Sequence, residues 1–300
     1  MSRSKIKQML HNGRILVAGR PQRQFDLPIH EGDTIEIGPA VAMDVQPPSR
    51  FLRIVYEDRF LVVIEKQAGI LSMATSHLSL CLKTILDNYF ERTHQRCRAH
   101  VVHRLDRDTS GLMLFAKSRD VLQMFQDDWK GIVYDRRYVA VVRGHFAQAE
   151  GTIRSYLKDN KQYFTYSSPV DNGGKLAITH YRVLERGVDN DLVEARLDTG
   201  RKNQIRVHFA DLGHPVVGDK KYGANGGDDV AYSYPNGTNH KGNETNKSKE
   251  VTNKGKEVEH SLQTDANRLC LHAYRLYFVH PVTGEHLHFD TPVPREFQKL

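Results

Sequence analysis

Five ionisable side chains stand almost next to one another in the stretch HRLDRDTSG, residues 103–111. The apolar run GLMLFA begins directly after a group made up of His103, Arg104, Asp106, Arg107 and Asp108. Burying an unpaired charge is costly, so a strand that enters a hydrophobic core normally loses its charges first. The stretch is therefore either a solvated turn or a prepared site. In such a site a carboxylate could act as a nucleophile, accept a proton or stabilise positive charge.

Composition limits the classes of protein to consider. The chain has 300 residues, of which 39% are hydrophobic, enough for one large domain with or without a small one. The net charge of +7 favours an anionic partner such as nucleic acid. Residues 224–266 hold five lysines against seven acidic residues, so the rest of the chain carries +9. The folded part is more basic than the average suggests.

The three cysteines, Cys81, Cys97 and Cys270, have neither the spacing of a metal site nor that of a disulfide framework. A reducing compartment suits such a chain. The N-terminal segment lacks an apolar core, and no run of about 18 apolar residues occurs. We therefore expect a cytoplasmic protein that does not enter a membrane.

The pattern of the first 50 residues predicts a small domain and a linker. Ile6, Met9 and Leu10 have helical spacing, and RILVAGRP and GDTIEI then read as strands. Two consecutive prolines keep the following segment extended. We expect a small domain over residues 1–40 and a linker over residues 41–50.

Residues 51–300 read as one domain of mixed α+β class. Helices are predicted in LSLCLKTILDNYFER, RDVLQMFQDDWKG and QIRVHFADLG, the last with Ile205, Phe209 and Leu212 facing inward. Strands outnumber helices, and many of their connections are short, which predicts a largely antiparallel central sheet with flanking helices. Residues 224–266 are rich in Asn, Gly, Lys and Ser, and we expect a disordered insertion there.

A metal site is a weaker hypothesis. His103, His208 and His214 invite it, but their spacings form no recognised ligand set with a matching carboxylate.

Five segments of the domain, taken in order, resemble the RluA-type pseudouridine synthases. HRLDRDTSGLMLFAK resembles the catalytic motif of that family, and YVAVVRG resembles its "YxAxVxG". TGRKNQIRVH followed by GHPVVGDKKYG, and then the closing residues 271–285, resemble its later motifs. Gln67 stands where the family has proline, and Lys202-Asn203 replaces its usual pair. Residues 1–40 resemble a truncated RNA-binding domain of the kind named after ribosomal protein S4.

The resemblance implies the pseudouridine synthase fold, RNA as partner and isomerisation of uridine to pseudouridine without a cofactor. The N-terminal domain favours large-subunit ribosomal RNA as the substrate, with transfer RNA as the alternative. Separately, we expect a monomer. It implies Asp106 as the catalytic carboxylate, Arg206 as its ion-pair partner and Tyr138 as the ring that stacks on the target base. Ile205 would line the same pocket. Phosphate contacts would suit Arg104, Arg107, Arg201 and Lys202.

Two other functions stay open from the residues alone. A binding protein without catalysis could keep this fold, although it would have no reason to keep Asp106, Tyr138 and Arg206 together. A hydrolase of nucleosides or sugars could use Asp106 and Asp108 as a carboxylate pair. On an extended chain these two residues lie about 6–7 Å apart, a separation that does not exclude glycosidase chemistry.

Overall fold

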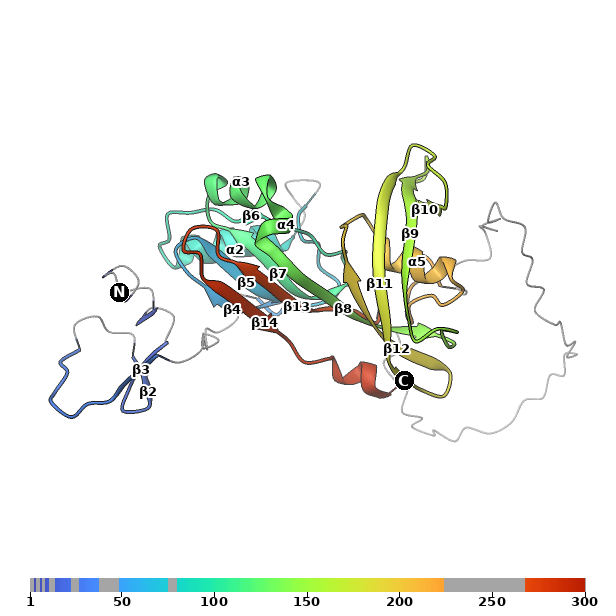
Figure 1. Ribbon diagram of the computed structural model, residues 1–300. Helices are drawn as coiled ribbons and strands as arrows, with labels where there is room; N and C mark the ends of the chain where they lie inside the picture. Colours follow the sequence, from blue (N-terminus) through green and yellow to red (C-terminus); the bar gives the residue numbers. More distant parts are fainter. Residues whose placement is uncertain are drawn as a thin grey trace, which may run out of the picture.

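The strands of the described chain form two separate β-sheets (Figure 1). The computed structural model describes residues 3, 6, 9, 10, 14–22, 27–37, 49–74, 80–223 and 268–299. A three-stranded sheet lies near the N-terminus, and an eleven-stranded sheet runs through the rest. The expected α+β class, with a mixed and largely antiparallel sheet, is confirmed. The insertion expected over 224–266 lies outside the described residues.

The small sheet has β1 (Ile15–Val17) at its centre, between β2 (Arg20–Gln22) and β3 (Ile35–Ile37). Both pairs are antiparallel, and the two expected strands are confirmed. Between β1 and β2 the chain turns through Ala18 and Gly19, with φ of 50° and 72°. Two left-handed residues are what a tight two-residue hairpin requires, and glycine adopts that conformation without strain.

The helix expected before this sheet is helical at the residues that the structure describes, and Met9 and Leu10 are buried. Most of the expected linker, residues 41–48, lies outside the described residues. The likeness to an S4-type domain and the domain boundaries therefore stay predictions.

The large sheet follows the order β10-β9-β11-β12-β8-β13-β7-β5-β4, with β14 paired to β13 and β6 to β7. Among the described strands, β7 and β13 form the one parallel pair. The strands are β4 (Leu52–Glu57), β5 (Leu61–Lys66), β6 (His100–Val101), β7 (Ser110–Ala116), β8 (Val133–Arg143), β9 (Glu150–Asp159), β10 (Thr165–Ser168), β11 (Lys175–Arg186), β12 (Asn190–Leu197), β13 (Leu271–Val279) and β14 (His286–Asp290).

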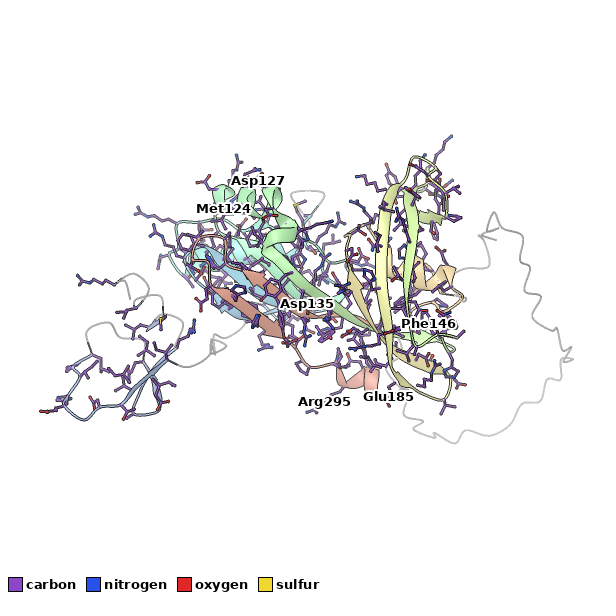
Figure 2. The ribbon with its side chains drawn as sticks, viewed as in Figure 1. Met124, Asp127, Asp135, Phe146, Glu185 and Arg295 are labelled. Atoms are coloured by element: carbon purple, nitrogen blue, oxygen red, sulfur yellow. The ribbon has the colours of Figure 1, made fainter. Side chains whose placement is uncertain are left out.

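Helices α2 (Leu82–Arg92), α3 (Arg119–Asp127) and α4 (Trp129–Ile132) accompany one half of this sheet (Figure 1). The sequence predicts one helix where the structure has α3 and α4. Asp128 separates them, because its backbone leaves the helical region and its side chain accepts a hydrogen bond from the Gly131 amide at 2.9 Å. Met124 and Asp127 of α3 point away from the sheet (Figure 2). No helix of the described residues is both long and apolar enough to span a membrane.

Helix α5 (Gln204–Asp211) packs against β10 and β11, and a short 3-10 helix, η1 (Arg295–Lys299), follows β14. Ile205 and Phe209 face inward as expected, but the prediction for Leu212 is wrong. Because α5 ends one residue earlier, Leu212 caps the helix and stays 44% exposed.

Strand β7 is buried along its whole length and begins at the end of the HRLDRDTSG stretch. Met113 and Phe115 pack in one hydrophobic cluster, whereas Leu112 and Leu114 pack in another on the opposite side. At Gly111 a Cβ atom would lie 2.2 Å from the carbonyl oxygen of Ala273, so only glycine lets β7 approach β13 this closely. The loop before β7 is thus attached to a rigid strand.

Two buried histidines hold elements of the sheet together. His208 of α5 hydrogen-bonds Ser155 and Thr179, each at 2.9 Å. His272 of β13 hydrogen-bonds Ser110 at 2.7 Å and Thr291 at 2.9 Å. Burial lowers the pKa of each imidazole to about 4, so both are neutral in the folded protein at neutral pH.

Acid should therefore destabilise the fold before most carboxylates titrate. The unfolded chain binds protons at these histidines below pH 6.5 while the folded chain does not, so the free energy of unfolding falls between about pH 6.5 and pH 4. Two such groups give a slope of up to roughly 3 kcal/mol per pH unit. Urea unfolding at pH 7, 6 and 5 measures that slope. The double variant His208→Gln/His272→Gln should reduce it, and the buried His103, whose pKa is lowered by burial to about 3, should supply the slope that remains. His30→Gln, at an exposed histidine, should leave it unchanged. Equal slopes in all three proteins would contradict this account.

Candidate active site

Asp106 lies in the loop between β6 and β7, and the end of β5 and the segment after it hydrogen-bond the backbone of this loop on both sides of Asp106. Lys66, which has no exposed surface, donates hydrogen bonds from Nζ to the carbonyl oxygens of Arg107 and Thr109, each at 2.7 Å. The Ser72 hydroxyl donates to the carbonyl oxygen of Leu105 at 2.7 Å. Lys66 was not among the residues expected at the site, although a lysine at the end of an apolar strand indicates a buried charge with specific partners.

The ammonium group of Lys66 is buried near two carboxylates, and both features affect its pKa. Burial lowers the pKa of its ammonium group to about 7, and the nearby carboxylates of Asp108 and Asp106 oppose that shift. Its hydrogen bonds all go to backbone carbonyl oxygens. Lys66 therefore fixes the loop without bonding to the carboxylate of Asp106. The Asp106 side chain is 20% exposed.

Arg206 projects from α5 to the same place. Its Nη1 lies 3.5 Å from Asp106 Oδ2, which is the pair that the sequence suggested. Its strongest contacts go elsewhere: Nε and Nη2 donate to the two carboxylate oxygens of Asp219, at 2.7 Å and 2.8 Å. A two-point arginine–carboxylate contact fixes the guanidinium plane as well as its position.

Asp219 was not among the residues expected at the site, although it lies in the GDKKYG segment. Its side chain is fully buried and also accepts hydrogen bonds from the backbone amides of Lys221 and Tyr222, at 2.8 Å and 3.0 Å. Burial acts against the charge of Arg206, but the attraction of Asp219 and then of Asp106 outweighs it and raises the pKa of the guanidinium. Asp219 therefore compensates the buried charge of Arg206 and fixes the orientation of its guanidinium beside Asp106.

An inner recess of about 50 Å³ brings together Asp106, Tyr138, Ile205 and Arg206. Tyr138, on β8, is 5% exposed, and Ile205 is 4% exposed. Burial raises the pKa of the Tyr138 hydroxyl; the charge of Arg136 opposes this shift, and that of Asp106 adds to it. The four residues expected at the centre of the site thus line one small recess.

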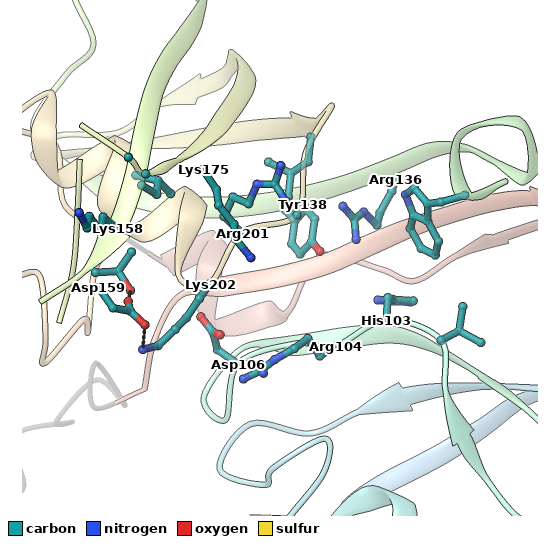
Figure 3. A pocket seen from close by; sticks show the side chains of 18 residues that line it. His103, Arg104, Asp106, Arg136, Tyr138, Lys158, Asp159, Lys175, Arg201 and Lys202 are labelled. Carbon is teal, nitrogen blue, oxygen red and sulfur yellow. Dashed lines mark hydrogen bonds and ion pairs between the residues drawn. The ribbon is translucent and has the colours of Figure 1, made fainter. Parts of the chain in front are cut away.

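A larger outer cavity of about 680 Å³ adjoins the recess and shares Asp106, Tyr138 and Arg201 with it. Figure 3 shows Asp106 and Tyr138 within it, with basic side chains around them. Of the four residues expected at phosphates, Arg104, Arg201 and Lys202 line this cavity. The fourth, Arg107, does not: it is 64% exposed and lies beside Asp108, at 3.3 Å.

Three further cations line the outer cavity and were not singled out from the sequence: Arg136, Lys158 and Lys175. The acidic residues that line it are Asp106 and Asp159. Lys202 donates to Asp159 at 2.9 Å, which neutralises one of these acids. Such a cavity favours a polyanion over a neutral ligand.

The carboxylate pair of the hydrolase hypothesis does not form a shared site. Asp108 is 45% exposed beside Arg107 and lines neither the recess nor the outer cavity. The three histidines of the metal hypothesis serve separate partners: His103 accepts from the Leu114 amide, His208 is the buried bridge described above, and His214 donates to the carbonyl oxygen of Arg143. Within the part of the chain that the structure describes, no three His, Cys, Asp or Glu side chains gather as metal ligands would.

Comparison with known proteins agrees with this geometry. Residues 60–211 match the profile of a family described as RNA pseudouridylate synthase. The chain is 32% identical over 305 residues to the Bacillus subtilis protein YlyB, an uncharacterized RNA pseudouridine synthase, covering all of this chain and 88% of that one. It is 32% identical over 310 residues to the ribosomal large subunit pseudouridine synthase D of Xanthomonas campestris, covering all of this chain and 83% of that one.

Solved structures show the same fold. Human RNA pseudouridylate synthase domain containing 4 aligns with a TM-score of 0.58 at 23% identity, over 82% of this chain and 90% of that one. Human RNA pseudouridylate synthase domain containing 1 gives 0.56 at 24% identity, over 83% and 86%.

The buried pair of Arg206 and Asp219 should be strongly coupled. Asp219→Asn leaves a largely buried guanidinium without its main counter-charge and should lower the free energy of unfolding by about 3 kcal/mol. The double variant Asp219→Asn/Arg206→Gln should cost clearly less than the two single variants added together. Urea unfolding of the four proteins measures the coupling. The exposed pair of Arg53 and Glu65, treated in the same way, is the control and should give less than about 1 kcal/mol. Additive costs at the buried pair would contradict the arrangement described here.

Proposed function

Because the chain belongs to the RNA pseudouridylate synthase family, and is an isomerase that converts uridine in RNA to pseudouridine, we propose that Asp106 is its catalytic carboxylate. The observation that carries this proposal is the inner recess, where the carboxylate is set beside Arg206 and that arginine is in turn fixed by the buried Asp219. A carboxylate that must stay ionised in an enclosed site needs such a neighbouring cation.

The reaction explains why one carboxylate can suffice. The bond between N1 of uracil and C1′ of ribose breaks, the detached base turns, and a bond between C5 and C1′ forms. The proton on C5 then leaves, and N1 gains one, so atoms and charge balance without oxidant or external donor. A carboxylate near C1′ can stabilise the positive charge that develops there or bond to the sugar, and it can accept the proton from C5.

Tyr138 and Ile205 are proposed to hold the uracil. A base that leaves its RNA stack loses aromatic contacts and needs a flat or apolar surface in return. The ring of Tyr138 and the side chain of Ile205 line the recess beside Asp106, where such a base would have to lie. Burial keeps the Tyr138 hydroxyl protonated at neutral pH, so it can donate a proton or a hydrogen bond.

The RNA backbone is proposed to run through the outer cavity, with Arg104, Arg201 and Lys202 at its phosphates. We propose large-subunit ribosomal RNA as the substrate, because proteins named ribosomal large subunit pseudouridine synthase D align with the whole of this chain. Arg107 does not line the cavity and would reach only RNA that extends beyond it. A cytoplasmic location and a monomeric state remain predictions.

A pseudouridine map of cellular RNA tests the proposal. In cells that lack this protein, specific sites in large-subunit ribosomal RNA should lose pseudouridine, and wild-type protein should restore them. Asp106→Asn should restore none, because the amide keeps the shape of the side chain but neither carries the negative charge nor accepts the proton. Asp108→Asn, the same change two residues away outside the recess, is the matched control and should restore the sites.

Restoration by Asp106→Asn would show that this carboxylate is not catalytic. Loss of sites from transfer RNA alone would refute ribosomal RNA as the substrate. If deletion changed no site and the purified protein converted no uridine in RNA from the deletion strain, the binding-only function would replace the proposed one.

A further inference from the structure

Strand β8 presents two neighbouring arginines to opposite faces of the sheet. Side chains alternate along a strand, so Arg136 shares the face of Tyr138, whereas Arg137 points to the other face. Arg137 is paired with acids there: it donates to Asp135 at 2.8 Å and to Glu194 at 3.1 Å. Arg136 lines the outer cavity beside Tyr138 (Figure 3).

Arg136 is held by aromatic rings instead of by acids. Its guanidinium carbon lies over the ring of Trp129, 5.3 Å from the ring centre, and 5.9 Å from the ring centre of Tyr138. Trp129 packs against the hydrophobic cluster beside β7 and has the His103 ring at 5.8 Å on centroids. Cation–ring contacts of this kind fix a guanidinium without occupying its N–H groups.

The N–H groups of Arg136 have no acceptor among the residues that the structure describes. Three other cations of the cavity differ in this respect: Lys158 donates to the carbonyl oxygen of Asn172 at 3.2 Å, Arg201 to that of Leu176 at 2.9 Å, and Lys202 to Asp159. Arg136 is half-buried, so the solvation of its charge is also reduced. A positioned guanidinium with five free donors in an excess of positive charge is suited to a bidentate anion.

We propose that Arg136, positioned by Trp129, binds a backbone phosphate next to the target uridine. This inference rests on the proposed function, since it takes RNA in the outer cavity as given. A phosphate is favoured over a uracil carbonyl for two reasons. First, the ring contacts occupy the face of the guanidinium and leave its N–H edge free, and this edge matches two phosphate oxygens. Second, the excess of positive charge in the cavity favours an anion over a neutral group.

Trp129 thus positions Arg136 as Asp219 positions Arg206. Arg136 would fix the phosphate within reach of Tyr138, and so the position of the nucleotide relative to Asp106. Trp129 is a positioning residue, because it acts only through Arg136. Since Trp129 is the single tryptophan of the chain, its fluorescence also reports directly on this place.

Binding of a fluorescein-labelled dodecauridylate, measured by anisotropy over a range of salt concentrations, tests the proposal on the full chain. Each phosphate neutralised on a single strand contributes about 0.7 to the slope of log affinity against log salt. Arg136→Gln should weaken binding about tenfold and lower the slope by about 0.7. Arg182→Gln, at an exposed arginine paired with Glu194 on the other face of the sheet, is the matched control and should change neither.

The role of Trp129 is tested in the same assay. Trp129→Leu should lower the slope as Arg136→Gln does, and Trp129→Phe, which keeps an aromatic ring, should retain it. In the wild-type protein, titration with unlabelled dodecauridylate should change the tryptophan fluorescence, and in Arg136→Gln this change should be lost at the same concentrations.

Three results would overturn the proposal. Weaker binding by Arg136→Gln with an unchanged slope would indicate that Arg136 contacts a neutral group such as a uracil carbonyl. Unchanged affinity and slope in Arg136→Gln would show that Arg136 makes no contact with the RNA, and an equal loss in Arg182→Gln would indicate a general effect of charge. The assay needs no turnover. The binding assay can therefore refute the phosphate contact even if Asp106 is catalytic, and it can support the contact even if Asp106 is not.

Discussion

The buried contact between Arg206 and Asp219 is the interaction on which the geometry of the site depends. Two charges are taken out of water, which is costly, and only a well-formed pair repays that cost. Both carboxylate oxygens of Asp219 are used by Arg206, and two backbone amides hold one of them further. Nη1 of Arg206 donates to Asn203 Oδ1 at 3.1 Å and lies 3.5 Å from Asp106 Oδ2. Asp106, the proposed catalytic carboxylate, thus has a cation beside it that does not depend on it for its own position.

The sheet brings the parts of this arrangement together from distant places in the chain. Lys66 ends β5 and holds the loop of Asp106, while β7 anchors that loop between two hydrophobic clusters. Tyr138 comes from β8, and Arg206 comes from α5, which packs against β10 and β11. Because each element is fixed by its own buried contacts, the recess between them is preformed, and little of the binding energy of RNA is needed to assemble it.

Much of the fold could be predicted because local patterns determine it. The sequence pattern predicted strands in RILVAGRP and GDTIEI, and the structure has β1 and β3 there. The errors lie where single contacts decide: Asp128 splits one helix into two, and the early end of α5 exposes Leu212. Asp219 and Lys66 were missed for a related reason. Which acid faces which base depends on tertiary packing, and no short spacing in the sequence reports it. Arg136 and Arg137 look alike in sequence, yet the pleat of β8 gives them different surroundings.

The most direct test of the central claim is the single-turnover rate of pseudouridine formation by Asp219→Asn on RNA that carries the mapped site. The variant keeps Asp106, Tyr138 and Arg206 and alters only the group that aims the arginine. If the account is right, the rate at saturating RNA falls about a hundredfold, because small displacements of reacting groups cost that much, while RNA affinity stays within about twofold. A folded variant that reacts at the wild-type rate would contradict it.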